Sequence, residues 1–513
     1  MLFALGCKTP ISKDYRLHYK SYNDLIHAST GTEVKNEYLK AHMKNGDVYL
    51  YAEGWNTDNE TRYLEGECKG FDANRYLFHS GYKKILIDSI SVFETNKPLP
   101  SKDKSRMVAM GIITGMDVVL GIICLTVPKA CFGSCPTFYL GDDSNVNYAD
   151  AEGFSSSICK ALEEGDIDAL NNTKTAKNEF TLTLKNEAME SHAINKISVL
   201  AAKRYLNHRI YQTPDNKFFS ANKLTELQSA HENGKDISSL LKAFDHQEYF
   251  NVTDSNQLNK KEIIEITFSN SNAMQKGLIL KFRQTLLTTF LFYTAYSKMG
   301  NEVSDWIEKM NNEKWVKQKY EGVISHLGGI EVWAYNKQSK TWLKSGEYNE
   351  AGPIAFNLQL LQLPVEISDQ KEIKIKIIMT RGMWRIDGAA LASIFQEEHP
   401  IELPVINVLL NNQNQPEMVN QLAHDDESYL GTTSGESYQL KFELPTADDY
   451  ELFVYSKGYY LEWMRQSWLD KKDIQGLYRM TAFDPLQWKQ LAKEFKLQES
   501  EMESVFWGSK NSN

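Results

Sequence analysis

The alternation of apolar and polar residues changes several times along the chain. Strand-like runs dominate residues 31–100 and 131–280: residues 85–93 pass from an apolar run into alternation, and residues 180–184 alternate strictly. A period of two is typical of strands with one buried face. Polar turns separate these runs, so the pattern predicts small antiparallel sheets in both stretches.

A helical pattern replaces the alternation in residues 281–327. Leu286, Phe290 and Leu291 recur at i, i+4 and i+5. That spacing places them on one wide face of a helix. We therefore predict a helical segment with a buried stripe.

Residues 328–400 contain the clearest β pattern. Residues 372–377 alternate isoleucine with charged side chains, as in a strand whose lysines point outward. Such strands, joined by short turns, predict a unit resembling a β-sandwich or jelly roll. Residues 401–513 are predicted to add one strand and then helices. Together these segments predict an α+β, β-rich protein of several domains.

The most apolar stretch, residues 107–127, allows two interpretations. Its length is enough to cross a bilayer, and Gly111 and Gly115 have the spacing that lets membrane helices pack closely. Asp117 at its centre would cost about 2.5–3.5 kcal/mol on insertion scales. We therefore expect residues 101–130 to form a hydrophobic helix or hairpin buried beneath the sheets, with a membrane-spanning helix as the alternative.

Composition narrows the class of protein. The chain has 513 residues, of which 24% are charged and 42% hydrophobic, as in globular proteins and unlike disordered chains. A formal net charge of −10 argues against broad nucleic-acid binding. The six cysteines are too widely spread for a disulfide framework and include no Cys-x-x-Cys pair. We therefore expect no metal site and no cofactor.

The first residues resemble the end of a bacterial lipoprotein signal. A short apolar run precedes Gly6 and Cys7, and in such signals a small residue precedes the cysteine that becomes acylated. The run is shorter than a full signal of ~15–30 residues and has no basic start. The resemblance implies that residues 1–7 are part of a signal, that Cys7 carries a lipid anchor and that residues 8–30 form a tether. The alternative is an ordinary cysteine in a cytoplasmic chain.

The most distinctive string in the chain is Cys-Phe-Gly-Ser-Cys-Pro at residues 131–136. It resembles the opening of a small β domain of unknown function that occurs in envelope proteins of Bacteroidetes, with Phe138 and Tyr139 near the family's usual tyrosine position. The string at residues 458–463 also resembles uncharacterised lipoproteins of that group. The resemblance implies a lipid-anchored protein of the cell envelope, at the outer membrane, and supplies no reaction.

Cys131 and Cys135 enclose Gly133 and precede Pro136, residues that favour a turn over a helix. A tight turn would bring the two Cα atoms within the ~4.4–6.8 Å that a disulfide requires. We therefore expect a structural disulfide in an oxidising compartment, or buried thiols. The alternatives are a redox pair, which needs an exposed thiolate of lowered pKa, and a pair of metal ligands.

The chain lacks the usual sequence motifs of catalysis. It has no Gly-x-Ser-x-Gly elbow, no His-Glu-x-x-His and no phosphate-loop or dinucleotide motif. Ser157 and Lys160 match Ser-x-x-Lys, but the companion motifs of that enzyme class are missing. The polar cluster at residues 424–427 predicts a hydrated loop, with weak calcium binding as the alternative. We therefore predict no catalytic residue.

Three tryptophans in the β unit are candidates for ligand binding. Trp333, Trp342 and Trp384 would stack on sugar rings if they shared an exposed face, with Arg385 and Asp387 as polar anchors beside Trp384. The alternative is that the tryptophans fill the core of the unit, where alternation places at least one of them.

These observations predict a non-enzymatic lipoprotein of the cell envelope that acts as a structural or interaction component. Its expected partners are the membrane, through the lipid anchor, and other envelope proteins or glycans, but not nucleic acid. One alternative is a carbohydrate-binding protein that uses residues 328–396. A second is a hydrolase whose site carries no recognised motif.

Overall fold

The computed structural model describes most of the chain from residue 135 onward and shorter pieces before it. The described residues are 16–17, 39–43, 47–51, 54–58, 63–71, 77–95, 135–140, 149–170, 178–186, 190–349, 352–410, 412–433, 436–446, 448–462, 468 and 471–508. Cys7, Cys131 and residues 107–127 lie outside these ranges. The lipid anchor, the disulfide and the location of the apolar stretch therefore stay predictions.

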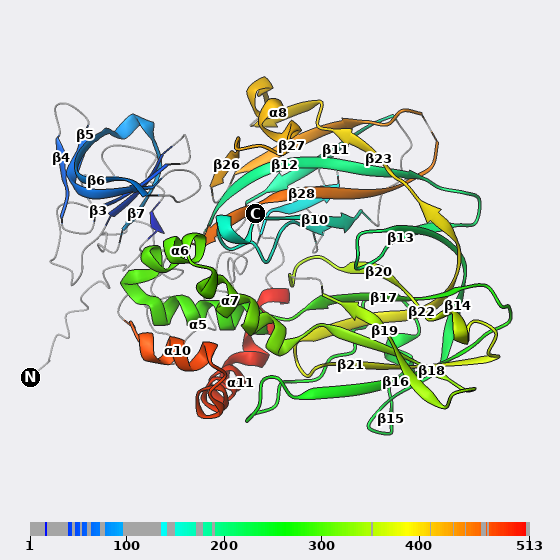
Figure 1. Ribbon diagram of the computed structural model, residues 1–513. Helices are drawn as coiled ribbons and strands as arrows, with labels where there is room; N and C mark the ends of the chain where they lie inside the picture. The colour runs from blue at the N-terminus through cyan, green and yellow to red at the C-terminus, as the bar shows by residue number, and fades with distance from the viewer. Residues whose placement is uncertain are drawn as a thin grey trace, which may run out of the picture.

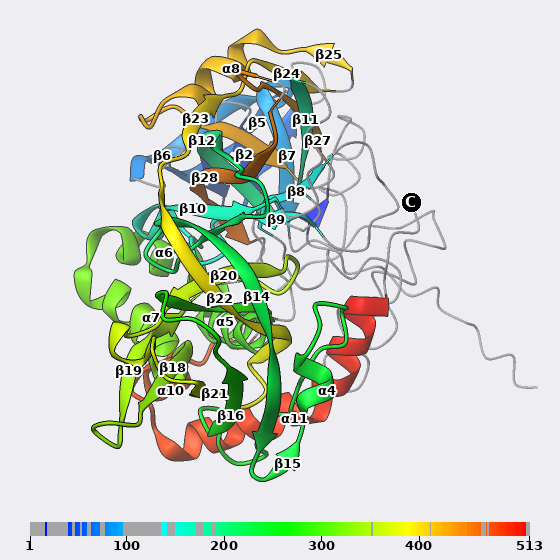
Figure 2. The same ribbon diagram turned by 90° about the vertical axis from the view of Figure 1, so that its right-hand side faces the viewer.

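Four β-sheets and a group of helices make up the described part of the chain (Figure 1). A small N-terminal sheet and a two-sheet sandwich occupy the upper part of the molecule, and a ten-stranded sheet occupies the lower part. The view in Figure 2 shows the same two levels, with long strands running between them. The predicted α+β, β-rich, multi-domain class is confirmed.

The N-terminal sheet has the strand order β1-β7-β2-β3-β5-β4, with β6 on β5. Tyr51, Trp55 and Leu64 are buried in its core. An ion pair of 3.2 Å joins Lys69 to Asp305 on a helix of the main body. The strands are β1 (Arg16–Leu17), β2 (Leu39–Met43), β3 (Val48–Tyr51), β4 (Asn56–Asp58), β5 (Tyr63–Phe71), β6 (Leu77–Leu86) and β7 (Ile90–Thr95), with the short helix η1 (Ile87–Ser89) before β7.

Two antiparallel sheets form the sandwich. One has the order β10-β28-β12-β23, with β26 on β12, and the other has the order β25-β24-β27-β11-β8-β9. Leu182 and Phe442 from one sheet meet Ile197 and Val454 from the other in a shared core, as in sandwiches with one buried face on each sheet.

The first sandwich sheet contains β10 (Glu164–Ala169), β12 (Glu190–Lys203), β23 (Ile401–Pro404), β26 (Leu430–Thr433) and β28 (Tyr450–Glu462). The second contains β8 (Thr137–Leu140), β9 (Ala151–Glu152), β11 (Glu179–Lys185), β24 (Asn407–Leu410), β25 (Gln413–Asn414) and β27 (Ser437–Glu443). The short helices η2 (Lys160–Leu162) and α8 (Pro416–Ala423) connect strands of the sandwich.

The ten-stranded sheet has the order β13-β20-β17-β22-β14-β16-β21-β18-β19, with β15 on β14. Because β13 pairs with β14 as well as with β20, five of the strands close into a ring around Tyr211, Ile279 and Leu360. The strands are β13 (Arg209–Gln212), β14 (Phe218–Glu232), β15 (Lys235–Asp236), β16 (Lys261–Ser269), β17 (Lys276–Gln284), β18 (Ile330–Asn336), β19 (Thr341–Tyr348), β20 (Asn357–Gln362), β21 (Glu372–Thr380) and β22 (Trp384–Glu398).

The helices pack beside both β units. Phe290 of α5 meets Phe495 of α11 at a ring distance of 5.0 Å in the core beneath the ten-stranded sheet. Trp306 and Met310 of α6 are buried with Tyr459 at the end of β28. The helices are α4 (Ser238–Leu241), α5 (Leu287–Met299), α6 (Val303–Asn312), α7 (Lys314–Leu327), α10 (Ile474–Thr481) and α11 (Pro485–Gly508), with the short helices η3 (Gly300–Glu302) and η4 (Val365–Ile367).

The sheets do not follow the domain boundaries expected from the sequence. Residues 328–400 were expected to form a sandwich-like unit, but their strands belong to the ten-stranded sheet together with β13, β14, β16 and β17 from residues 209–284. The sandwich combines strands from residues 137–203 with strands from residues 401–462. The ten-stranded unit is thus inserted into the sandwich, an arrangement set by strand pairs too distant in sequence for local alternation to reveal.

Candidate functional site

A cavity of about 410 Å³ lies between the sandwich and helices α5 and α7. We call it the interdomain cavity. Its walls come from segment 152–164, from α5 and α7, from the end of β28, and from Asn349, Gly352 and Pro353. Two units that meet along irregular segments commonly leave such a space, and ligand sites often lie there.

Glutamates dominate the charge of this cavity. Its described lining contains five glutamates and one lysine, so five carboxylates less one ammonium give a formal charge of −4. The exposed Glu164 and Glu321 lie at its outer part, whereas Glu152 and Glu462 are buried. The remaining charged residues are Glu163 and Lys317.

Some of these charges have protein partners. Glu163 forms an ion pair of 2.7 Å with Lys160 and accepts a hydrogen bond from the Tyr429 hydroxyl at 3.0 Å. Lys317 lies 3.7 Å from Glu321 and donates to the Ala161 carbonyl at 2.8 Å. The one ammonium of the lining is therefore already engaged.

Aromatic side chains form much of the remaining wall. The rings of Phe292 and Tyr320 stack at 5.4 Å with an angle of 15° between their planes. The Tyr320 hydroxyl donates to the Ser156 carbonyl at 2.8 Å, and the Tyr460 hydroxyl donates to the Ser155 carbonyl at 3.1 Å. These two bonds fix segment 155–156 between α7 and β28.

The buried phenols and the thiol of the cavity are neutral. Burial raises the pKa values of Tyr296, Tyr320 and Tyr460 well above the ordinary tyrosine value. Burial, together with the Glu152 carboxylate, also raises the pKa of the Cys135 thiol well above its usual value. Cys135 therefore lacks the thiolate character that a nucleophilic or redox cysteine needs.

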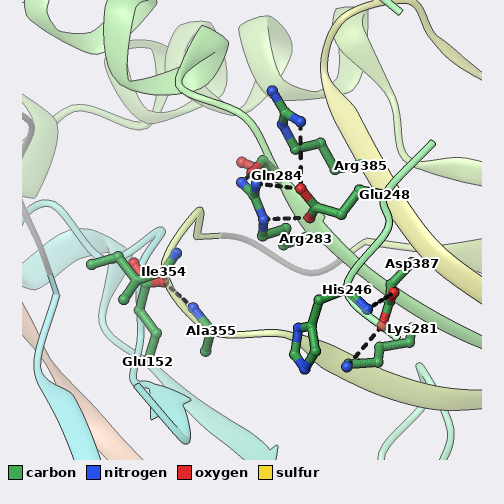
Figure 3. Close-up of polar contacts among 10 residues, drawn as sticks. All are labelled: Glu152, His246, Glu248, Lys281, Arg283, Gln284, Ile354, Ala355, Arg385 and Asp387. Carbon is green, nitrogen blue, oxygen red and sulfur yellow. Dashed lines mark hydrogen bonds and ion pairs between the residues drawn. The ribbon is translucent and has the colours of Figure 1, made fainter. Parts of the chain in front are cut away.

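Glu152 ties the sandwich to the loop that borders the cavity (Figure 3). Its Oε2 atom accepts hydrogen bonds from the backbone amides of Ile354 at 2.7 Å and Ala355 at 3.2 Å. Gly352 has a φ of +106°, and a Cβ atom there would lie 2.6 Å from the Glu152 carboxyl. A side chain at position 352 would thus displace the loop from the carboxylate that holds it.

A second group of charged residues, also drawn in Figure 3, joins strands β17 and β22 to the segment that holds His246 and Glu248. Glu248 accepts from Arg283 through both carboxylate oxygens, at 2.6 and 2.7 Å, and lies 3.4 Å from Arg385. Asp387 lies 2.8 Å from the Lys281 ammonium and accepts the His246 backbone amide at 2.6 Å. The group therefore fastens the segment that holds His246 and Glu248 across the two strands.

The five predicted ligand-binding residues do not share one surface. Trp384 is 1% exposed and packs on Phe282 at 5.8 Å, so it fills the core. Arg385 and Asp387 belong to the charged group on β17 and β22. This division follows from the strand pleat, because neighbouring residues of a strand point to opposite faces.

Trp333 and Trp342 lie on the outer face of β18 and β19 and are half-buried. The Lys376 ammonium lies 4.6 Å from the centre of the Trp342 ring and 5.7 Å from that of Trp333. Tyr335 packs on Trp342 at 5.3 Å. Sugar stacking on these indoles would require Lys376 to move.

Of the remaining predicted sites, the structure describes Cys135 and the polar cluster at residues 424–427. Cys135 is buried, and its expected partner Cys131 lies outside the described residues, so the disulfide between them stays a prediction. In the cluster at 424–427, Asp425 forms an ion pair of 2.6 Å with Lys457. No group of three or more His, Cys, Asp or Glu side chains suited to a metal ion occurs among the described residues.

Sequence reasoning missed the cavity itself. Lys317, Tyr320 and Glu321 of α7 and Phe292 and Tyr296 of α5 follow the spacing of one helix face. The repeat of aromatic and charged residues on one face of each helix is the only local signal of this wall. Nothing local in the sequence indicates that this face lies opposite segment 152–164.

Comparisons with known proteins do not place the chain in a family. No protein-family model matches it, and no curated protein matches it. Among solved structures, it is similar to the secreted serine protease VesC from Vibrio cholerae, with 10% sequence identity over 70% of this chain and 73% of that chain. The TM-score is 0.13, too low to carry an argument about fold or activity.

None of the helices in the described part of the chain combines the length and the apolar character that crossing a bilayer requires.

Proposed function

We propose that this protein is a non-catalytic component of the cell envelope that binds a small molecule in the interdomain cavity. The observation that carries the proposal is a cavity of about 410 Å³ with buried polar and aromatic walls. Cavities of roughly 300–1,000 Å³ that combine apolar walls with a few fixed polar groups are the usual form of small-ligand sites.

The contacts that hold the walls support this function. Glu152 fixes the bordering loop, and the hydroxyls of Tyr320 and Tyr460 fix segment 155–156. A site whose walls are already held in place loses little conformational entropy when a ligand enters. The neutral Cys135 thiol favours binding over covalent chemistry.

Filling the cavity tests this function. Thr289 of α5 lines the cavity, so the indole of Thr289→Trp would occupy the ligand's space. We expect native mass spectrometry of the full chain to show a co-purifying small molecule on the wild type and none on this variant. Ser297→Trp, on the same helix but outside the lining, should keep the molecule.

The proposal is contradicted if the wild-type chain carries no molecule and its melting temperature does not change with any member of a library of amines, amino acids and sugars. Retention of the molecule by Thr289→Trp would place the binding site elsewhere.

We also propose that Cys7 holds the protein at the membrane, as the resemblance of residues 1–7 to a lipoprotein signal suggests. Two acyl chains on one residue give stable anchoring, whereas one chain is marginal. Cys7→Ser, expressed from the native start, should move the protein from the membrane pellet to the soluble fraction on immunoblots. Unchanged membrane retention would exclude Cys7 as the sole anchor.

A further inference from the structure

A second, apolar pocket adjoins the interdomain cavity. It measures about 70 Å³ and lies among α5, α6, α7 and α10. Ile158, Phe292, Tyr296 and Tyr320 line both spaces, so the two meet at these side chains. The other apolar residues of its lining include Leu291, Met299, Trp306, Met310, Val316 and Leu477. The cavity and this pocket together offer a polar compartment and an apolar one.

The polar compartment favours a cation. Its described lining has a formal charge of −4, of which Lys160, outside the lining, offsets the Glu163 carboxylate at 2.7 Å. The one lysine of the lining is engaged with Glu321 and the Ala161 carbonyl. Carboxylates near a low-dielectric wall attract a positive group more strongly than they would in water. The stacked rings of Phe292 and Tyr320 add aromatic surface, with which cations also interact favourably.

A buried hydroxyl without a hydrogen-bond partner among the described residues lies where the two compartments meet. Tyr296 is 4% exposed, lines both spaces, and its hydroxyl has no hydrogen-bond partner among the described residues. Burial keeps this phenol protonated because it raises the pKa well above the ordinary value. An unsatisfied buried hydroxyl costs free energy, and a ligand that bonds it would recover that loss.

The apolar compartment favours a short hydrocarbon group. Its walls include Met299, Met310 and Met480, whose flexible and polarizable side chains adapt to ligands of different shape. Trp306 and Leu477 are buried there, so an apolar group would contact them rather than water. Its volume of about 70 Å³ is smaller than the roughly 150 Å³ of an apolar cavity that holds benzene, so it accepts a short alkyl chain, or a ring that lies partly in the adjoining interdomain cavity.

We propose that the ligand is an amphiphilic amine, with its ammonium among the carboxylates of the interdomain cavity and its ring or short alkyl chain in the apolar pocket. This inference rests on the proposed ligand-binding function and names the chemical class that the site accepts. It requires that the positive charge and the apolar group both contribute to affinity.

Four probes separate these contributions in calorimetric titrations of the full chain. They are 2-phenylethylamine, which has both groups, ethylamine, which lacks the ring, 2-phenylethanol, which lacks the charge, and 3-phenylpropionate, which is an anion. We expect 2-phenylethylamine to bind at least tenfold more tightly than ethylamine and 2-phenylethanol, and 3-phenylpropionate not to bind. Added salt should weaken the amine because it screens the carboxylates.

Two sets of variants locate the groups. Ala295 of α5 lines the apolar pocket but not the interdomain cavity. In Ala295→Phe, the affinity for 2-phenylethylamine should therefore fall to about the affinity for ethylamine. The affinity for ethylamine itself should not change. Glu164→Gln combined with Glu321→Gln removes the two exposed carboxylates and should weaken both amines at least threefold. Glu164 and Glu321 are exposed, and exposed side chains tolerate such changes, so the double glutamine variant should melt within a few degrees of the wild type.

The outcomes distinguish this inference from the function on which it rests. If 2-phenylethanol or 3-phenylpropionate binds as tightly as 2-phenylethylamine, or if the co-purifying molecule is an anion or a sugar, the amine assignment is wrong and the binding function stands. If Ala295→Phe leaves the preference for 2-phenylethylamine intact, the apolar pocket is not the ring's site. If the wild type carries no molecule and responds neither to these probes nor to the library of amines, amino acids and sugars, the binding function itself fails.

Discussion

Replacing Asp387 by alanine is expected to destabilise the folded protein by about 3–5 kcal/mol, the cost of removing one partner of a buried ion pair. Asp387 is fully buried, and its carboxylate lies 2.8 Å from the ammonium of Lys281, which is itself largely buried. It also accepts the His246 backbone amide at a residue whose φ is +67°. The variant would leave the Lys281 charge and the His246 N–H without this acceptor.

Urea unfolding of the full chain, followed by tryptophan fluorescence, would measure this loss. Combining Asp387→Ala with Lys281→Met removes both charges and should restore part of the stability, because a buried charge is no longer left alone. The exposed pair Asp215–Lys217, at 2.8 Å, is the matched control: Asp215→Ala should cost less than about 1 kcal/mol. Equal losses for Asp387→Ala and Asp215→Ala would contradict our account of the buried pair.

Truncating Trp384 to alanine is the second change with a large expected effect, a loss of about 3–5 kcal/mol. The side chain is 1% exposed and packs on Phe282 within the core of the ten-stranded sheet. Alanine would leave a cavity that neighbouring strands cannot close. Trp384→Phe keeps an aromatic ring in the core and should cost clearly less.

Trp333 provides the control for this substitution, because its indole lies on the outer face of the same sheet. Trp333→Ala should cost about 1 kcal/mol or less, since it removes a half-buried ring and its contact with Lys376. The midpoint of chemical unfolding would compare the two variants. A larger loss for Trp333→Ala than for Trp384→Ala would reverse the assignment of core and surface.

Local alternation was enough to predict which face of a strand is buried. Ile373, Ile375 and Ile377 of β21 are fully buried, and Lys374 between them is exposed, as the pattern at residues 372–377 indicates. The helical stripe expected in residues 281–327 corresponds to α5, where Phe290 and Leu291 are buried. Both predictions concern properties that a few neighbouring residues determine.

Partners distant in the sequence could not be predicted in this way. The strand β21 pairs with β16, about 110 positions earlier, and not only with its neighbour β18. The cavity likewise needs both Glu152 and Tyr320 in its walls. These residues are far apart in the sequence, and no sequence motif links them. Only the tertiary arrangement shows that a helix face with tyrosines and glutamates lies opposite the sandwich.

The insertion of the ten-stranded unit into the sandwich has a consequence for synthesis on the ribosome. Lys203 of β12 pairs with Tyr450 of β28, and these residues are about 250 positions apart. At ~5–20 residues per second, β28 would emerge about 12–50 s after β12. For that time the apolar residues of β12 lack their longest neighbouring strand, so the nascent chain exposes an aggregation-prone edge. A chaperone that covers this edge during translation would have its greatest effect on the sandwich, even though the sandwich contains the earlier strands.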